Sequence, residues 1–217
     1  MKRGVVIGWG CCIAMASILF SCKEDTVDYG LDTYYVEIVT AQSANQFLTD
    51  NGKTLLATDN KKTFTSGDRV LMNYTLLSAT ASDGDYAVRL NGSVKIPLGK
   101  LALTDDSTVK ASACEPVRLE SAWIGSHYLN MQLYFDYRSA THRIGLIADS
   151  TRLNSDTLRM YFTHDTNNDP PGYPVHTYLS FDLKDVLGAP AAGNARRPLS
   201  MQINTSNYGN KAYAFEY

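Results

Sequence analysis

Apolar and polar residues alternate with a period of two along most of the chain. In residues 128–137 one face carries the apolar set Leu129, Met131, Leu133, Phe135 and Tyr137. Similar alternation recurs in 158–163, 178–183 and 213–217. This pattern is typical of antiparallel strands with one buried face. The alternation predicts an all-β protein.

Turn-forming sequences separate these runs, and strands at such spacing are typical of β-barrels and β-sandwiches. The early strand candidates are 34–40, 54–57, 70–77, 86–90 and 94–96, with a turn at Asn91-Gly92 between the last two. Five short strands fit a small barrel such as the OB fold. About seven strands follow, which is the size of an antiparallel β-sandwich.

The polar stretch 104–108, followed by Cys114-Glu115-Pro116, suggests a boundary between the two domains. We therefore predict an OB-like barrel over 34–112 and a β-sandwich over 113–217. Short helices are expected only near 41–48 and 183–187.

The first residues have the layout of a secretory signal peptide. Lys2 and Arg3 precede an apolar run from Gly4 to Phe20, and Ser21 stands before Cys22. The run is short and glycine-containing for a membrane span, which needs about 20 apolar residues. We predict a signal over residues 1–21, with a retained single-span anchor as the alternative.

The sequence Leu19-Phe20-Ser21-Cys22 resembles the bacterial lipobox, in which cleavage leaves a lipidated cysteine. Each buried methylene of an acyl chain such as palmitate contributes about 0.8 kcal/mol, so two or three chains anchor a protein stably. Cys22 is therefore the predicted lipid-attachment site. The expected location is the outer membrane, with exposure at the cell surface as one orientation.

An acidic segment, residues 22–33, follows as a predicted tether. Lys23-Glu24-Asp25 resembles the surface-export signal of Bacteroidetes lipoproteins, and a plain flexible linker is the alternative. If Lys2 and Arg3 leave with the signal, 18 of the 20 basic residues remain against 22 acidic ones. Such a balance disfavours a phosphate backbone as partner, so no nucleic acid is expected.

No motif of catalysis or metal binding is present. The four histidines, His127, His142, His164 and His176, lack the spacing of a zinc site. Residues 165–169 match the start of an EF-hand loop, but Pro170 and His176 break the pattern, and a proline-stopped turn is the better interpretation. We predict no cofactor, no metal and no catalytic residue, although paired carboxylates from distant segments leave no local signature.

A row of polar and aromatic residues opposite the apolar face of 128–137 is the candidate binding face. It consists of Tyr128, Asn130, Gln132 and Tyr134. Tyrosines and amides suit stacking on sugar rings or docking of another protein. The alternative is a second buried layer.

Four short motifs fit the Asp-Ser/Thr-apolar pattern of Bacteroidetes O-glycosylation. Their acceptor residues would be Thr26, Ser107, Ser150 and Thr157. Ordinary loop turns rich in Asp and Thr produce the same pattern.

Several stretches in order resemble the NigD-like lipoproteins of Bacteroidetes. They are Gly67-Asp68-Arg69-Val70, the span 123–130, the span 142–147 and the span 178–183. The resemblance implies an N-terminal OB-type domain, a C-terminal β-sandwich and an envelope location. It implies no established activity and no catalytic residue.

We accordingly expect a lipid-anchored envelope protein that acts as a non-enzymatic binding or interaction module. Its expected partners are the membrane, through Cys22, and envelope proteins or glycans. A surface glycan-binding subunit of a nutrient-uptake system is the alternative, and a hydrolase with two carboxylates in a cleft is a third hypothesis.

Overall fold

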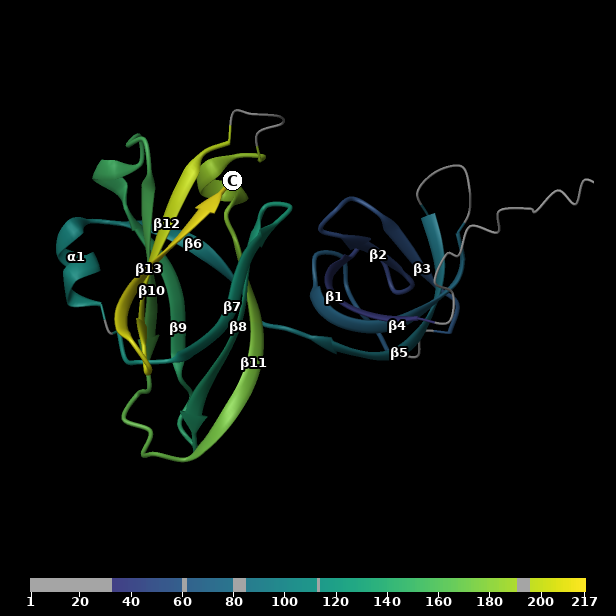
Figure 1. The fold of residues 1–217 in the computed structure, drawn as a ribbon, viewed down its shortest axis with the longest axis horizontal. Coiled ribbons are helices and arrows are strands. Elements are labelled where there is room, and N and C mark those ends of the chain that lie inside the picture. The colour runs from purple at the N-terminus through teal and green to yellow at the C-terminus, as the bar shows by residue number, and fades with distance from the viewer. Residues whose placement is uncertain (1–32, 60–61, 80–84, 113, 191–195) are drawn as a thin grey trace, which may run out of the picture.

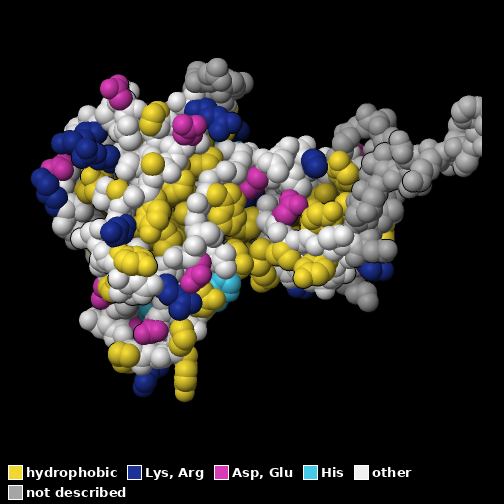
Figure 2. All heavy atoms as spheres, in the orientation of Figure 1, with side chains coloured by type: hydrophobic (Ala, Val, Ile, Leu, Met, Phe, Trp, Pro, Cys, Tyr) yellow, Lys and Arg dark blue, Asp and Glu magenta, His cyan; other side chains and the backbone are white. Residues whose placement is uncertain are grey.

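Two separate apolar cores divide the chain into two β domains. The computed structural model describes residues 33–59, 62–79, 85–112, 114–190 and 196–217. Figure 1 shows the domains side by side, and Figure 2 shows that they meet at a narrow waist. The predicted all-β fold class is confirmed.

The first domain is a closed five-stranded barrel. Its strands are β1 (Tyr34–Ala41), β2 (Gln46–Thr49), β3 (Thr54–Ala57), β4 (Arg69–Ala79) and β5 (Asp85–Lys95). They follow the order β1-β2-β3-β5-β4, in which β1 closes the ring by pairing with β4 and β3 pairs with β5 in parallel. The interior is filled by alternate side chains that include Val39, Phe47, Leu55, Val70 and Met72.

The barrel departs from the sequence prediction at two points. Residues 41–48 contain the end of β1 and the start of β2, not a helix. Asn91-Gly92 lies inside β5, because the register shifts beside Asn73 and Tyr74 and leaves Asn91 without a partner in the ladder. The Asn91 side chain donates to Asn73 Oδ1 and Thr75 Oγ1, both at 3.0 Å, so the expected turn is a β-bulge.

Over its described residues, the second domain contains eight strands and three short helical turns. Its elements are β6 (Leu98–Thr104), α1 (Asp106–Ala111), β7 (Arg118–Gly125), β8 (Tyr128–Tyr137), β9 (Arg143–Asp149), η1 (Ser150–Arg152), β10 (Leu158–Asp165), β11 (Tyr173–Asp182), α2 (Lys184–Leu187), β12 (Pro198–Thr205) and β13 (Gly209–Glu216). The strand order is β13-β12-β10-β9-β6-β11-β8-β7. This curved sheet encloses the larger core, which includes Leu129, Met131, Met160, Phe162 and Met201.

Strand β6 corrects two details of the predicted organisation. It pairs in parallel with both β9 and β11, so the sheet is mixed and not purely antiparallel. Residues 98–112 therefore belong to the second domain, and the barrel ends near residue 96, not at 112. The polar stretch 104–108 misled the prediction because it forms α1, a helix capped by Asp105 within the second domain.

A buried arginine of the barrel joins the two domains. Arg69 has no exposed surface, and its guanidinium lies 4.0 Å from the ring of Tyr128. It forms a bidentate pair with Asp50, at 2.7 and 2.9 Å. It also donates to Asn130 Oδ1 at 2.8 Å, Thr40 Oγ1 at 2.8 Å and Ser180 Oγ at 3.4 Å. An arginine side chain offers five N–H donors, and these contacts account for all of them.

The remaining polar atoms of this interface bond to one another. Asn130 Nδ2 donates to Asp50 Oδ2 at 2.9 Å, and Ser180 Oγ donates to Asn130 Oδ1 at 2.7 Å. A Cβ at Gly125 would lie 2.2 Å from Asp50 Oδ2, so only glycine permits this approach. The network thus spans β4 of the barrel and β7, β8 and β11 of the second domain.

Replacing Arg69 with Met should lower the free energy of unfolding of the whole protein. Asp50 would keep its charge but lose its partner, and breaking a buried pair in this way costs about 3–5 kcal/mol. Chemical denaturation would measure the loss. Small-angle scattering would show a broader distribution of domain orientations.

Arg118→Met is the matched control, because Arg118 also stacks on a tyrosine at 4.0 Å but lies at the surface. Its expected cost is at most about 1 kcal/mol. Equal losses in the two variants would contradict a special role for Arg69.

Candidate functional site

A hollow opens where two paired strands of the second domain separate. β10 and β12 pair in parallel from Leu158/Leu199 to Tyr161/Gln202 and then diverge. The segment 114–117 enters between them: Glu115 N donates to His164 O at 2.9 Å, and Val117 N donates to Asn204 O at 3.1 Å. We call this segment the wedge.

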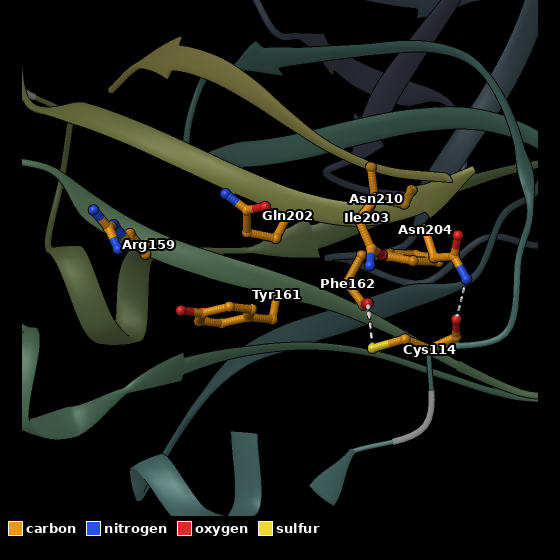
Figure 3. A pocket seen from close by; sticks show the side chains of 8 residues that line it. All are labelled: Cys114, Arg159, Tyr161, Phe162, Gln202, Ile203, Asn204 and Asn210. Atoms are coloured by element: carbon orange, nitrogen blue, oxygen red, sulfur yellow. Dashed lines mark hydrogen bonds between the residues drawn. The ribbon is translucent and has the colours of Figure 1, made fainter. Parts of the chain in front are cut away.

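The hollow has a volume of about 450 Å³, which lies within the usual range of ligand pockets. Its lining residues are Cys114, Arg159, Tyr161, Phe162, Gln202, Ile203, Asn204 and Asn210. Figure 3 shows Arg159, Tyr161 and Gln202 projecting from neighbouring strands, with Cys114 at the opposite end from Arg159. We refer to this hollow as the groove.

Strand alternation places the polar side chains of the groove outside the core. Leu158, Met160 and Phe162 are buried, so Arg159 and Tyr161 face outward. The same rule turns Gln202 outward between buried Met201 and Ile203. The alternation was predicted from the sequence, but the groove was not. The divergence of β10 from β12 is a relation between two strands and cannot be read from the sequence of either strand alone.

The polar groups of the groove are largely unpaired. Within the described ranges, no hydrogen bond is formed by the guanidinium of Arg159, the hydroxyl of Tyr161 or the amides of Gln202 and Asn210. Asn204 differs, since its Nδ2 donates to Cys114 O at 2.7 Å, which leaves its amide oxygen open. A molecule bound in the groove would therefore meet one aromatic ring and several polar groups with open hydrogen-bonding capacity.

The thiol at the end of the groove is not activated. Burial raises the pKa of Cys114, and its Sγ lies 4.0 Å from Phe162 O. A reactive cysteine requires the opposite shift, toward the thiolate. The Cys114 thiol is therefore held toward its neutral form.

The predicted binding face is divided by the domain interface. Tyr128 and Asn130 are buried under the barrel, with 5% and 0% exposure, so neither is available at the surface. Tyr134 is half-buried, with the Arg118 guanidinium at 4.0 Å on one side and the His176 ring stacked at 4.5 Å on the other. These two neighbours already occupy the ring of Tyr134.

Gln132 is similarly engaged. Its Nε2 lies 2.9 Å from His176 Nε2, and its Oε1 accepts from Ser121 at 3.2 Å. The four residues thus do not form one open platform. The expected stacking surface is not formed, because Arg69 of the barrel covers the end of this sheet face that carries Tyr128 and Asn130.

Two histidines that are distant in sequence form a buried pair. His142 Nδ1 lies 3.0 Å from His164 Nε2, and His142 Nε2 lies 3.3 Å from Asp169 Oδ2. At the other end, His164 Nδ1 lies 3.2 Å from the carbonyl oxygen of Glu115. The side chains of His142 and Asp169 are 3% and 1% exposed.

Acceptors lie at both ends of this pair. The carboxylate of Asp169 and the carbonyl oxygen of Glu115 accept hydrogen bonds from the outer nitrogens of the two rings. Burial lowers the pKa of His164, which disfavours the charged form of that ring. The two rings thus tie β10 to the wedge and to the loop that contains Asp169.

Asp169 also closes the loop that the EF-hand comparison singled out. Burial opposes its ionisation, but the N–H groups of Ala140, Arg138 and Ser139, together with His142, outweigh burial and lower the pKa of Asp169. Asn167 and Asn168 adopt left-handed backbone angles, with φ of 55° and 60°. The carboxylate is thus committed to the protein, as expected for a turn and not for a calcium loop.

The other candidate residues are dispersed. Ser107 in α1, Ser150 in η1 and Thr157 before β10 are all exposed. Cys22, Lys23, Glu24, Asp25 and Thr26 lie outside the described residues. Across the described ranges, no group of three or more His, Cys, Asp or Glu side chains is placed to hold a metal, and no helix is long and apolar enough to span a membrane.

Comparison with known families covers almost the whole described chain. A model for an NigD-like N-terminal OB domain matches residues 35–96, and one for an NigD-like C-terminal β-sandwich domain matches 97–217. The chain belongs to the NigD-like family. The junction between the two matches coincides with the end of the barrel.

Solved structures share the fold of this NigD-like protein. A protein of unknown function from Bacteroides vulgatus is 20% identical, with a TM-score of 0.72, over 85% of this chain and 91% of that one. A protein described as an NigD-like immunity protein from Bacteroides caccae is 21% identical, with a TM-score of 0.63, over 84% and 96%. A protein from Bacteroides fragilis described as a candidate lipoprotein is 10% identical, with a TM-score of 0.60, over 85% and 98%.

At these identities the likeness shows the fold alone. Among curated proteins none matches this chain. The function of the NigD-like protein must therefore be argued from its own residues.

Replacing Asp169 with Asn should destabilise the second domain. The N–H groups of Arg138, Ser139 and Ala140 would lose their anionic acceptor, at a cost of about 3 kcal/mol near neutral pH. Because the pKa of Asp169 is lowered by folding, its contribution is present above the ordinary value of about 4 and declines below it. Denaturation at a series of pH values should show wild type and Asp169→Asn converging as the solution becomes more acidic.

Asp136→Asn provides the control, since Asp136 is exposed near the end of β8, next to the loop that Asp169 binds. Its effect should stay within about 0.5 kcal/mol. A constant gap between wild type and Asp169→Asn over the whole acid range would show that the carboxylate's charge is not what stabilises the loop.

Proposed function

We propose that this NigD-like protein is a lipid-anchored binding protein of the cell envelope and that it performs no catalysis. The observation that carries the proposal is the groove, where an aromatic ring and several unpaired polar side chains face one hollow. The raised pKa of the Cys114 thiol argues against covalent catalysis there. A binding role is what remains for such a set of contacts.

The envelope location rests on the N-terminal sequence. The apolar run that ends at Ser21-Cys22 supports cleavage and acylation at Cys22, and Lys23-Glu24-Asp25 supports export to the surface. The description of the Bacteroides fragilis relative as a candidate lipoprotein supports the same location. We therefore place the two domains on the outer membrane, held by acyl chains.

Two kinds of ligand follow from the surface. A glycan is favoured by the groove, because Tyr161, Gln202 and Asn210 combine a flat apolar ring with amides. A protein partner is favoured by the description of the Bacteroides caccae relative as an immunity protein, since an immunity role would also require a binding surface. We take the glycan as the ligand of the groove.

Cys22→Ala should release the protein from membranes. Acyl chains contribute about 0.8 kcal/mol per buried methylene, so their loss removes the anchor entirely. Fractionation of cells followed by blotting for the second domain would show wild type with the membranes and the variant in the soluble fraction. A variant that stays with the membranes would contradict lipidation at Cys22.

Protease treatment of intact cells then tests the orientation. Digestion of the wild-type protein on intact cells indicates surface display. Protection until the outer membrane is opened would assign the protein to the periplasmic side and remove the export role of Lys23-Glu24-Asp25.

Tyr161→Ala should abolish retention on a glycan matrix without unfolding the protein. The ring is half-buried at the surface, so its loss removes a stacking platform while the core is left intact. Affinity electrophoresis through gels that contain a panel of plant and bacterial polysaccharides would measure the retardation. Tyr173→Ala is the control, because Tyr173 is 84% exposed and lies outside the groove.

If wild type is retarded and both tyrosine variants behave alike, the groove is not the binding site. If wild type migrates freely in every gel, the proposal that the groove binds a glycan is refuted, and a protein partner becomes the favoured ligand.

A further inference from the structure

The groove has a distinct charge. Among the residues that the structure describes, Arg159 is its one charged lining residue, and no carboxylate lines it. Over the whole chain acidic residues outnumber basic ones, 22 to 20. The groove is therefore locally positive on a protein of net negative charge.

The positive charge is also free to bind. Most other arginines of the second domain have partners: Arg143 pairs with Asp165, Arg152 with Asp149 and Arg118 with Glu120. Arg159 forms no ion pair within the part of the chain that the structure describes. An unpaired guanidinium is suited to a planar oxyanion, to which it can donate two parallel hydrogen bonds.

The space beside Tyr161 accommodates a ring. In β13, the residue paired with Gln202 is Ala212, and the residue paired with Ser200 is Ala214, so at these two positions the neighbouring strand contributes only methyl groups. Gln202 and Asn210 extend amides that can both donate and accept hydrogen bonds. A ligand seated on Tyr161 would meet amides on one side and the guanidinium of Arg159 on the other.

We infer that the groove binds an acidic saccharide, that is, a sugar ring with neighbouring hydroxyls and one carboxylate. The inference rests on the proposed function, since it names the ligand class of the same groove. The apolar face of the sugar lies on Tyr161, its hydroxyls bond to Gln202 and Asn210, and its carboxylate pairs with Arg159. A phosphate group alone would leave the aromatic ring and the amides unused.

The test uses two ligands that differ only in the carboxylate. Methyl β-D-glucuronide and methyl β-D-glucoside are titrated at millimolar concentrations into the isotope-labelled soluble chain that begins after Cys22, and backbone amide shifts are followed by NMR. The expected result is shifts in β10 and β12, with the glucuronide bound at least about tenfold more tightly, as one charge-assisted pair allows.

Arg159→Gln should lower the protein's affinity for the glucuronide to its affinity for the glucoside. Arg89→Gln is the matched control, because Arg89 is an exposed arginine of the barrel and should leave both affinities unchanged. The difference between these two variants isolates the charge in the groove from the net charge of the chain.

Four results would overturn the inference. Equal affinities for the two sugars, or a glucuronide preference that survives Arg159→Gln, would refute the acidic ligand and leave a neutral-glycan groove in place. Shifts confined to residues outside the groove, or no shifts with either sugar, would refute the acidic ligand together with the groove as a sugar site.

Discussion

The arrangement of the two domains depends on the burial of one cation. Arg69 is tolerated at zero exposure because Asp50 neutralises it and every N–H of its guanidinium has an acceptor. Such contacts are directional, so they fix an orientation where an apolar interface would allow sliding. The same network buries Tyr128 and Asn130, so neither side chain is available for binding on the surface of the sheet.

Polar groups in the second domain follow the same logic on a smaller scale. The pair His142–His164 and Asp169 hold the loops that follow β8 and β10 by matching donors to acceptors. In both clusters the charged groups are largely withdrawn from water and satisfied within the protein. The groove is the contrast, since its polar atoms are left open, and this difference is what separates structural polar residues from residues available to a ligand.

The sequence was informative where a pattern is local. Alternation predicted the all-β class and most of the strands, and the short helix near 183–187 is present as α2. Asn91-Gly92 shows the limit, because the same dipeptide serves a turn or a bulge, and the partner strand decides between them. The prediction of an open row from Tyr128 to Tyr134 failed for a similar reason: whether a sheet face is covered depends on Arg69, about 60 residues earlier in the chain. The groove depends on how β10 and β12 diverge, a relation between strands that no single stretch of sequence records.

The wedge gives the fold a way to vary. Segment 114–117 belongs to the connection between α1 and β7, yet it sets how far β10 and β12 stand apart. Insertions or substitutions in this connection can widen or narrow the groove without changing the register of either strand. The width of the groove in this architecture can therefore change through one short loop, independently of the core that keeps the protein folded.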